Sequence, residues 1–225
     1  AIERAVLKFN SFDRKETIRI ISHLDADGIS AGAILIKVLN NENRKYLLSI
    51  LQQLSKDKIE EFSKEPYKYY IFTDLGSGQI SELERLMGEK EIIILDHHEI
   101  EKSTANNIVH INPHLFNIDG SNEISGAGVA YLFAKAINEK NKELSHLAII
   151  GALGDIQEDN GFKYLNSKIL EDAIKANKIN VKRGLRVFGA YTRPLHKVLE
   201  YSTDPYIPGV TGSESGAIQF LHQLG

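Results

Sequence analysis

Short, uninterrupted apolar runs recur along the chain and alternate with segments of helical periodicity. An unbroken Ile- and Leu-rich run is typical of a strand covered on both faces, and helices between such strands are typical of a parallel sheet. The runs expected to form strands are Ile18–Ser22, Tyr46–Leu51, Tyr69–Thr73, Glu91–Leu95 and Asn107–Ile111. The sequence therefore predicts an α/β fold, with a five-stranded, mainly parallel sheet and helices on both faces.

Helical periodicity fills most of the intervals between and after these runs. The expected helices lie near Ile29–Leu39, Lys56–Lys64, Gln79–Met87, Ala127–Asn138, Leu144–Leu153 and Leu165–Ala176. At 225 residues the chain is long enough for one large domain, or for one domain with a small addition.

Ionisable residues follow three of the expected strands and one of the expected helices. They are His23, Asp25 and Asp27 after the first strand, Asp74 after the third, Asp96, His97 and His98 after the fourth, and Asp155 after the helical run HLAIIGAL. In parallel sheets, ligands bind at the edge where the carboxyl ends of the strands meet. We therefore expect these residues to lie together.

Each residue taken alone has a simpler structural interpretation. An Asp in such a position commonly caps a helix or forms a turn, which is the alternative for Asp25, Asp27, Asp74 and Asp155. A shared site is favoured because five Asp side chains in one cleft would repel one another by several kcal/mol. No Lys or Arg lies within these motifs to neutralise them.

Divalent cations would neutralise such a cluster and keep the carboxylates ionised. The chain has no Cys, so the ligands must be carboxylates and imidazoles, which suit Mn²⁺ or Mg²⁺ better than structural Zn²⁺. Two such ions about 3.5–4 Å apart activate water and clamp a phosphoryl group for in-line displacement. The sequence thus predicts a phosphoesterase that uses two metal ions.

The motifs SHLDADGISAG, TDLGSG, DHH and GALGD resemble, in this order, those of the DHH phosphoesterase superfamily. Their wording is similar to that of RecJ-type single-strand exonucleases. It is most similar to archaeal RecJ-like nucleases associated with the GINS replication complex, which are related to a catalytically degenerate subunit of the eukaryotic replicative helicase. The tail TDPYIPGVTG at residues 203–212 also resembles that group.

The resemblance implies two sets of metal ligands that share one carboxylate. The first set is His23, Asp25 and Asp74, and the second is Asp27, Asp74, His97 and Asp155. It also implies that His98 faces the scissile phosphate, whereas Asp96 orients a histidine. Because none of the motif acids is replaced, an active enzyme is favoured over a degenerate relative.

The resemblance further implies a DHH catalytic domain at residues 1–200. RecJ proteins carry a second, DHH-associated domain that binds substrate and closes over the site. We expect residues 201–225 to connect to such a domain, which lies outside this chain, with the linker helix beginning within Ser213–Leu224.

A basic stretch offers candidate contacts to nucleic acid. Residues 173–199 contain seven Lys and Arg and no Asp or Glu, in a chain of net charge −3. Basic residues can follow a phosphate backbone, and Phe188 and Tyr191 could stack on bases. The alternative is a solvated face whose aromatic residues pack inward.

We expect substrate contacts from both side chains and backbone amides. The candidates are Arg183, Arg186, Arg193 and Lys197, with Gly126 and Gly128 from a glycine turn that resembles one in RecJ proteins. Amides of such a turn can bind phosphate, although a simple turn explains the glycines equally well.

Three functions compete at this level. The favoured one is a RecJ-like exonuclease that acts on single-stranded DNA, or RNA, in DNA replication or repair, with 5′→3′ polarity suggested by the family likeness. The second is a DHH enzyme for a small substrate: an oligoribonuclease, a cyclic-dinucleotide phosphodiesterase or a pyrophosphatase, although pyrophosphatases space the first-motif residues further apart than His23 and Asp25. The third is a scaffold in a GINS-type replication complex.

The sequence contains no signal-peptide pattern and no apolar run of membrane-spanning length. We therefore expect a cytoplasmic protein with no membrane partner. The composition, which is rich in Lys and Ile and lacks Cys, fits an archaeal protein.

Overall fold

The computed structural model describes residues 1–101, 107–159, 161–182, 187–190 and 192–225. The chain forms two compact units, Ala1–Asn180 and Val181–Gly225. The catalytic domain predicted for residues 1–200 would end about 20 residues after the boundary between these two units. That domain assignment stays a prediction.

The first unit is built on a five-stranded sheet in which every neighbouring pair is parallel. Its strands are β1 (Thr17–His23), β2 (Lys45–Leu51), β3 (Tyr69–Thr73), β4 (Glu91–Leu95) and β5 (Ile108–Ile111), in the spatial order β2-β1-β3-β4-β5. The predicted α/β fold is confirmed, with strand bounds within one residue or so of those expected.

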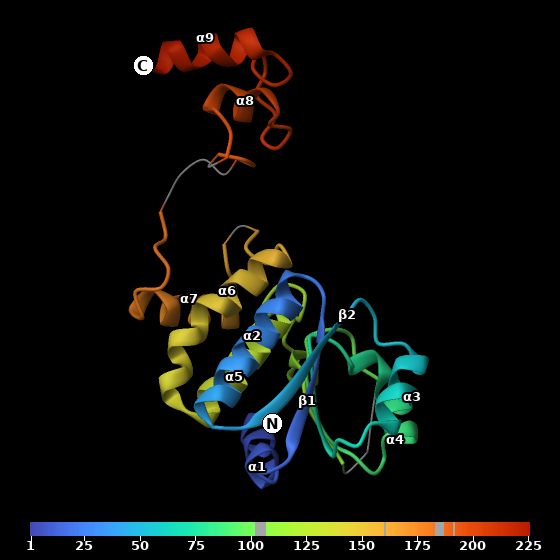
Figure 1. Cartoon of the computed structure of the whole chain (residues 1–225). Coiled ribbons are helices and arrows are strands. Elements are labelled where there is room, and N and C mark those ends of the chain that lie inside the picture. The colour runs from blue at the N-terminus through green and yellow to red at the C-terminus, as the bar shows by residue number, and fades with distance from the viewer. Residues whose placement is uncertain (102–106, 160, 183–186, 191) are drawn as a thin grey trace. The chain divides into compact units, whose positions relative to one another are not determined.

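Helices cover both faces of the sheet because side chains along each strand alternate between the faces. Ile20, Ile71 and Ile93 lie in register and belong to one buried cluster. Helices that pack on this face or behind it are α1 (Ile2–Ser11), α2 (Ala26–Asn41), α5 (Gly126–Ile137), α6 (Ser145–Gly154) and α7 (Tyr164–Lys175) (Figure 1). Phe72 and Ile94 belong to the opposite cluster, with α3 (Lys56–Lys64) and α4 (Ile80–Leu86).

The remaining regular elements in the described residues are three 3₁₀ turns and the two helices of the second unit. They are the 3₁₀ turns η1 (Ser77–Gln79), η2 (Pro113–Phe116) and η3 (Glu139–Leu144), and, in the second unit, α8 (Leu195–Glu200) and α9 (Glu214–Leu224). Leu199, Val210 and Ala217 form the small core of the second unit. The helix expected within Ser213–Leu224 is present as α9.

The strand order creates the place for a site. The chain passes from β1 to β2 on one side, and then returns to β3 on the other side of β1. The connections that leave β1 and β3 therefore diverge, which opens a crevice at the carboxyl ends of these two strands.

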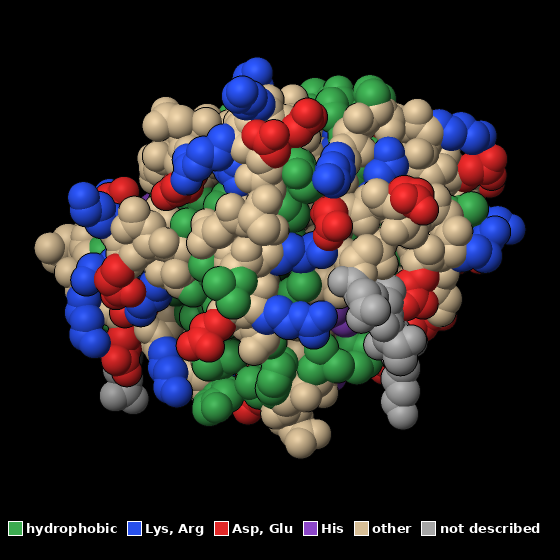
Figure 2. All heavy atoms as spheres, turned by 90° about the horizontal axis from the view of Figure 1, so that it is seen from below, with side chains coloured by type: hydrophobic (Ala, Val, Ile, Leu, Met, Phe, Trp, Pro, Cys, Tyr) green, Lys and Arg blue, Asp and Glu red, His purple; other side chains and the backbone are tan. Residues whose placement is uncertain are grey.

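Acidic, basic and apolar side chains are interspersed on the face shown in Figure 2. In the described parts of the chain, the helices are too short or too polar to cross a membrane. The predicted cytoplasmic location stays a prediction.

Candidate metal centre

The structure brings the ionisable residues of all four motifs together at the carboxyl edge of the sheet. Asp74 lies at the centre, directly after β3. Its φ of +58° is left-handed, and its amide donates to the Leu95 carbonyl at 2.9 Å, so the chain turns sharply as the strand ends. The Asp74 side chain is 1% exposed.

The two carboxylate oxygens of Asp74 face different histidines. Oδ2 lies 3.5 Å from His23 Nδ1, and Oδ1 lies 3.2 Å from His97 Nε2. Within the part of the chain that the structure describes, both Asp74 oxygens are buried without a hydrogen-bond partner. Buried polar atoms are normally satisfied, so this arrangement suits a bound cation better than a vacant site.

His23, Asp25 and Asp74 form the first half of the cluster. Asp25 Oδ2 lies 2.8 Å from His23 Nδ1, while Oδ1 accepts the Gly28 amide at 2.8 Å and caps α2. Burial disfavours ionisation, but the Gly28 N–H and the nearby His23 hold the pKa of Asp25 below its usual value. The capping interpretation of Asp25 is therefore right, and one oxygen remains for the cluster.

Asp27, His97 and Asp155 form the second half. His97 Nε2 lies 3.6 Å from Asp27 Oδ2 and 3.4 Å from Asp155 Oδ2. Asp27 accepts the amides of Gly126 at 2.6 Å and Ala127 at 3.0 Å, in the first turn of α5. Asp27 thus interacts with the positive N-terminal end of α5. It does not cap α2, which was the simpler interpretation of this residue.

Two glycines allow helices to approach these carboxylates. A Cβ on Gly151 of α6 would lie 2.2 Å from Asp27 Oδ1, and a Cβ on Gly126 would lie 2.6 Å from Asp74 Oδ1. Gly126 donates its amide to Asp27, and Gly128 donates its amide to Ser125 Oγ at 3.2 Å. Both amides predicted to contact substrate are therefore used within the chain, and substrate contact by these glycines stays a prediction.

Asp96 lies beside the cluster and holds His98. Its fully buried carboxylate accepts the Ser77 amide at 2.9 Å and the His97 amide at 2.8 Å, and Oδ1 lies 2.8 Å from His98 Nδ1. Burial disfavours the anion, but the His98 contact and the Ser77 N–H outweigh it and lower the pKa of Asp96. The His98 side chain is 54% exposed.

Asn112 was not expected from the sequence. Its Nδ2 donates to Ser77 Oγ at 2.9 Å and to the His98 carbonyl at 2.8 Å, and thus joins the loops after β3, β4 and β5. His110 Nε2 lies 2.8 Å from the same Ser77 hydroxyl. An Asn after a strand is an ordinary turn residue, so only the strand order reveals this role.

The electrostatics of the cluster favour bound cations. Burial and the charge of Asp27 raise the pKa of Asp155 to about 6, and burial also raises the pKa of Asp74. Burial would lower the pKa of His97, but Asp74 and Asp27 outweigh it and raise that pKa. The oxygen-rich set with imidazoles fits Mn²⁺ or Mg²⁺, which would replace the bound protons.

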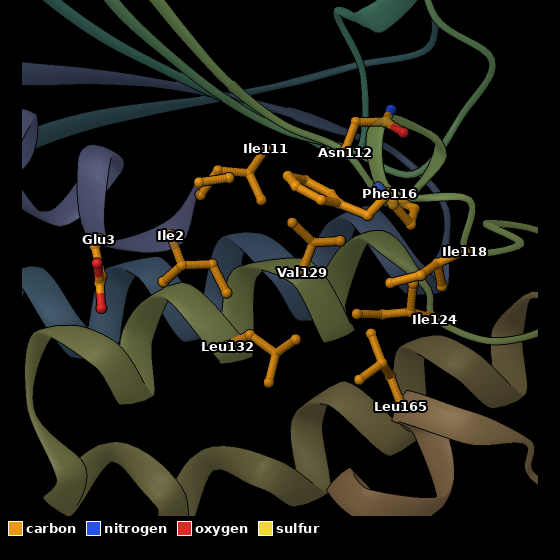
Figure 3. A pocket seen from close by; sticks show the side chains of 12 residues that line it. Ile2, Glu3, Ile111, Asn112, Phe116, Ile118, Ile124, Val129, Leu132 and Leu165 are labelled. Carbon is orange, nitrogen blue, oxygen red and sulfur yellow. The ribbon is translucent and has the colours of Figure 1, made fainter.

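An open pocket of about 440 Å³ adjoins the cluster. His23, Asp74, Asp96 and His98 contribute to its lining, together with Gln52, Gln53, Leu54, Leu75, Gly76, Gly78, Gln79 and Glu99. A second pocket, of about 400 Å³, is apolar and is lined mainly by residues of β5, α1, α5 and the segment after β5 (Figure 3). It contains none of the clustered Asp and His residues, so the first pocket is the candidate substrate site.

Of the predicted basic contacts, Arg193 and Lys197 fall in the second unit. Arg183, Arg186 and the aromatic Tyr191 lie outside the described residues. Lys197 Nζ lies 2.9 Å from both Glu200 and Glu214, whose contacts raise its pKa, and the Arg193 guanidinium lies 5.8 Å from the Tyr201 ring centroid. Phe188 is 91% exposed. Substrate binding by Arg193 and Lys197 stays a prediction.

Residues 17–154 match the family model described as the DHH family, N-terminal domain, which is more than half of the chain. The chain belongs to the DHH family. Residues 187–225 match a second model, the DHH-CID domain. The predicted RecJ-like DHH resemblance is therefore confirmed.

Two relatives of this DHH protein are informative. The uncharacterized protein MJ0831 of Methanocaldococcus jannaschii is 40% identical over 214 residues, which cover 92% of this chain and 48% of that protein. The single-stranded-DNA-specific exonuclease RecJ of Thermus thermophilus is 26% identical over 166 residues, which cover 68% of this chain and 24% of RecJ. The chain thus spans about half, or less, of the length of these relatives.

Solved structures share the fold. Exonuclease RecJ bound to manganese superposes with a TM-score of 0.63 at 23% identity, over 77% of this chain and 47% of RecJ. CDC45 from Entamoeba histolytica gives the same TM-score at 15% identity, over 99% of this chain and 55% of CDC45.

The close approach of α6 to Asp27 predicts the effect of Gly151→Ala. The added methyl group displaces the Asp27 carboxylate, so we expect a loss of about 1–3 kcal/mol in the free energy of unfolding and weaker Mn²⁺ binding. Denaturant titration and calorimetric Mn²⁺ titration measure the two effects. Gly78→Ala is the control, because a Cβ there meets nothing within 4 Å. Unchanged Mn²⁺ affinity in Gly151→Ala would contradict this geometry.

The raised carboxyl pKa values predict how metal binding depends on pH. Asp155 has a pKa of about 6 in the folded protein, against about 3.9 in an unfolded chain. Its contribution to stability therefore falls as pH rises through this interval, unless cations replace the protons. We expect Mn²⁺ to raise the melting temperature more at pH 8 than at pH 5.5, and Asp155→Asn to reduce this difference. An equal effect of Mn²⁺ at both pH values would rule out proton displacement.

Proposed function

We propose that this DHH protein is a phosphodiesterase that uses two divalent metal ions. The observation that carries the proposal is the position of Asp74, which directs one oxygen toward His23 and the other toward His97, with no hydrogen bond to either oxygen from the described residues. A carboxylate in this position can bridge two ions. The proposed ligands are His23, Asp25 and Asp74 for one ion, and Asp27, Asp74, His97 and Asp155 for the other.

Two bound ions, Mn²⁺ or Mg²⁺, would activate water and neutralise the charge that develops on a phosphoryl group. The chain contributes the arrangement of the ligands. Gly126 and Ala127 hold Asp27 through their amides, and Gly28 holds Asp25. These contacts fix the carboxylates before metal or substrate binds, so little rearrangement is needed during the reaction.

We propose that His98 acts on the substrate and that Asp96 positions His98. Because Asp96 Oδ1 lies 2.8 Å from His98 Nδ1, the Nδ1 proton is held by a carboxylate and Nε2 is left for other contacts. The exposed imidazole lines the pocket beside the cluster. From there, a protonated Nε2 can donate to a phosphate oxygen or to the leaving oxygen.

The proposed substrate is single-stranded DNA, with RNA as the alternative, and the proposed reaction is stepwise cleavage from the 5′ end in DNA replication or repair. The support is the match to the single-stranded-DNA-specific exonuclease RecJ, together with the RecJ-like sequences of the four motifs. The pocket of about 440 Å³ beside the cluster is large enough for one terminal nucleotide. Gln52, Gln53 and Gln79 offer amide groups to such a ligand.

A second candidate is a structural role in a GINS-type replication complex. The likeness to CDC45 extends over 99% of this chain, whereas the likeness to manganese-bound RecJ covers 77%. The complete set of clustered carboxylates and histidines favours catalysis, either as the sole activity or together with this structural role.

Asp74→Asn is the decisive variant. Asn resembles the protonated form that burial favours, so we expect the metal-free protein to keep its stability. We also expect loss of tight Mn²⁺ binding and at least about a 1,000-fold slower cleavage of single-stranded DNA, in line with the loss of a metal's contribution to catalysis. Strands labelled at the 5′ or the 3′ end, incubated with Mn²⁺ or EDTA, report both activity and polarity. Asp57→Asn, an exposed carboxylate on α3, is the matched control.

The outcomes separate the competing functions. Metal-dependent shortening of long strands that is lost in Asp74→Asn but kept in Asp57→Asn supports the exonuclease. Cleavage of dinucleotides alone supports the small-substrate alternative. Binding of Mn²⁺ without cleavage of either long strands or dinucleotides would contradict the enzyme and favour the structural role.

His98→Ala tests whether His98 acts on the substrate or binds a metal ion. Because His98 is assigned to the substrate and not to the metal ions, we expect the variant to keep the Mn²⁺ affinity of the wild type. Loss of a positioned acid should slow cleavage by about 10²–10⁴-fold. Single-turnover rates at saturating Mn²⁺ measure this, and a large loss of Mn²⁺ affinity would instead make His98 a ligand.

A further inference from the structure

The carbonyl of Gly120 sets the orientation of His97. His97 Nδ1 lies 2.7 Å from this oxygen, and a carbonyl can only accept a hydrogen bond. The Nδ1 atom therefore carries a proton, and Nε2 points at Asp27, Asp74 and Asp155 from 3.2–3.6 Å. Whatever holds the Gly120 carbonyl in place also determines where Nε2 points.

Gln157 holds that carbonyl. Its Nε2 donates to the Gly120 oxygen at 2.9 Å, and its Oε1 accepts from Asn166 Nδ2 at 2.7 Å. Asn166 also donates its backbone amide to the Glu123 carbonyl at 2.9 Å, so α7 is tied to the same segment. Gln157 is 3% exposed and Asn166 is fully buried, so neither amide exchanges these partners freely with water.

Close backbone packing and side-chain contacts hold Gly120 in position. A Cβ at this position would lie 2.0 Å from the His97 carbonyl, so the two backbones touch and only glycine fits. Ile118 and Ile124, on either side of Gly120 in the chain, contribute to the apolar pocket seen in Figure 3, so their side chains anchor the segment by packing. Among the residues that the structure describes, Gln157 and His97 make the polar contacts to the Gly120 carbonyl.

Gln157 also lies two residues after Asp155. Its own amide donates to the Ala152 carbonyl at 2.9 Å, at the end of α6, so the turn that carries Asp155 also carries Gln157. A movement of this turn would shift Asp155 directly and His97 through Gly120. Asp155 and His97, two of the three residues in the second half of the cluster, are thereby linked through one buried amide.

We propose that Gln157 is a positioning residue that, through the Gly120 carbonyl, aims His97 Nε2 at the metal centre, with Asn166 holding the Gln157 amide in place. This inference rests on the proposed metal-dependent function. Groups that orient a metal-bound imidazole commonly contribute about 10–100-fold to metal affinity.

The test replaces Gln157 by Met, which keeps an unbranched side chain of similar size but removes both polar ends. We expect Gln157→Met to weaken Mn²⁺ binding by about 10–100-fold in calorimetric titration. In the metal-free protein we expect faster solvent exchange of the His97 Nδ1–H proton, measured by ¹⁵N NMR of the imidazole. This second measurement requires neither metal nor activity.

Asn141→Met is the matched control. Asn141 is 2% exposed and donates Nδ2 to the Ala134 carbonyl at 2.9 Å, a buried amide contact of the same kind on η3. We expect this variant to lose stability while it keeps the wild-type Mn²⁺ affinity and the protection of the His97 ring proton.

Two results would overturn the inference. One is a Gln157→Met protein with wild-type Mn²⁺ affinity and a protected His97 ring proton. The other is an equal loss of affinity in Asn141→Met, which would show a general effect of destabilisation. Should Gln157→Met fail to fold, Asn166→Ala is measured in the same way. A wild-type protein that binds no Mn²⁺ refutes the proposed function, while the exchange of the His97 ring proton still decides whether Gln157 positions this histidine.

Discussion

The repulsion among buried carboxylates is the constraint on which the site depends. Asp27, Asp74 and Asp96 are each 1% exposed or less, and each is stabilised differently. Asp27 is held by amides at the start of α5, and Asp96 by amides and His98, whereas no described residue donates a hydrogen bond to either oxygen of Asp74. Backbone amides therefore stabilise the carboxylates of Asp27 and Asp96. The charge of Asp74 must instead be neutralised by cations or by protons.

The parallel sheet makes this arrangement possible. Because β1 and β3 are neighbours whose connections diverge, the motifs after them lie side by side, and the loop after β4 adds the two adjacent histidines. The α5 and α6 helices then close the cluster from the other side, and Gly126 and Gly151 permit their contact with Asp74 and Asp27. The carboxylates, in turn, satisfy amides that the ends of these helices would otherwise leave unpaired.

Most of the fold and of the acidic cluster could be predicted from the sequence, because uninterrupted apolar strands and glycine-flanked acids are local signals. The roles of Asn112 and Gln157 could not. Each is an ordinary polar residue in a turn, and its importance comes from a partner distant in sequence, His98 for Asn112 and Gly120 for Gln157. The helix α1 was also not expected, and it lies on the sheet through Ala5 and Phe9, among other buried side chains.

By itself, the sequence determined the class of the fold, the order of the motifs and the kind of chemistry that their side chains permit. Those properties depend on residue type and short-range spacing. Only the tertiary structure decided which oxygen of Asp74 faces which histidine, that Asp27 is held by α5 rather than by its own helix, and that the Gly126 amide donates to the Asp27 carboxylate. The physical reason is that a hydrogen bond depends on direction and on distances of a few tenths of an ångström, which follow from the packing of whole helices on the sheet and not from any short stretch of the chain.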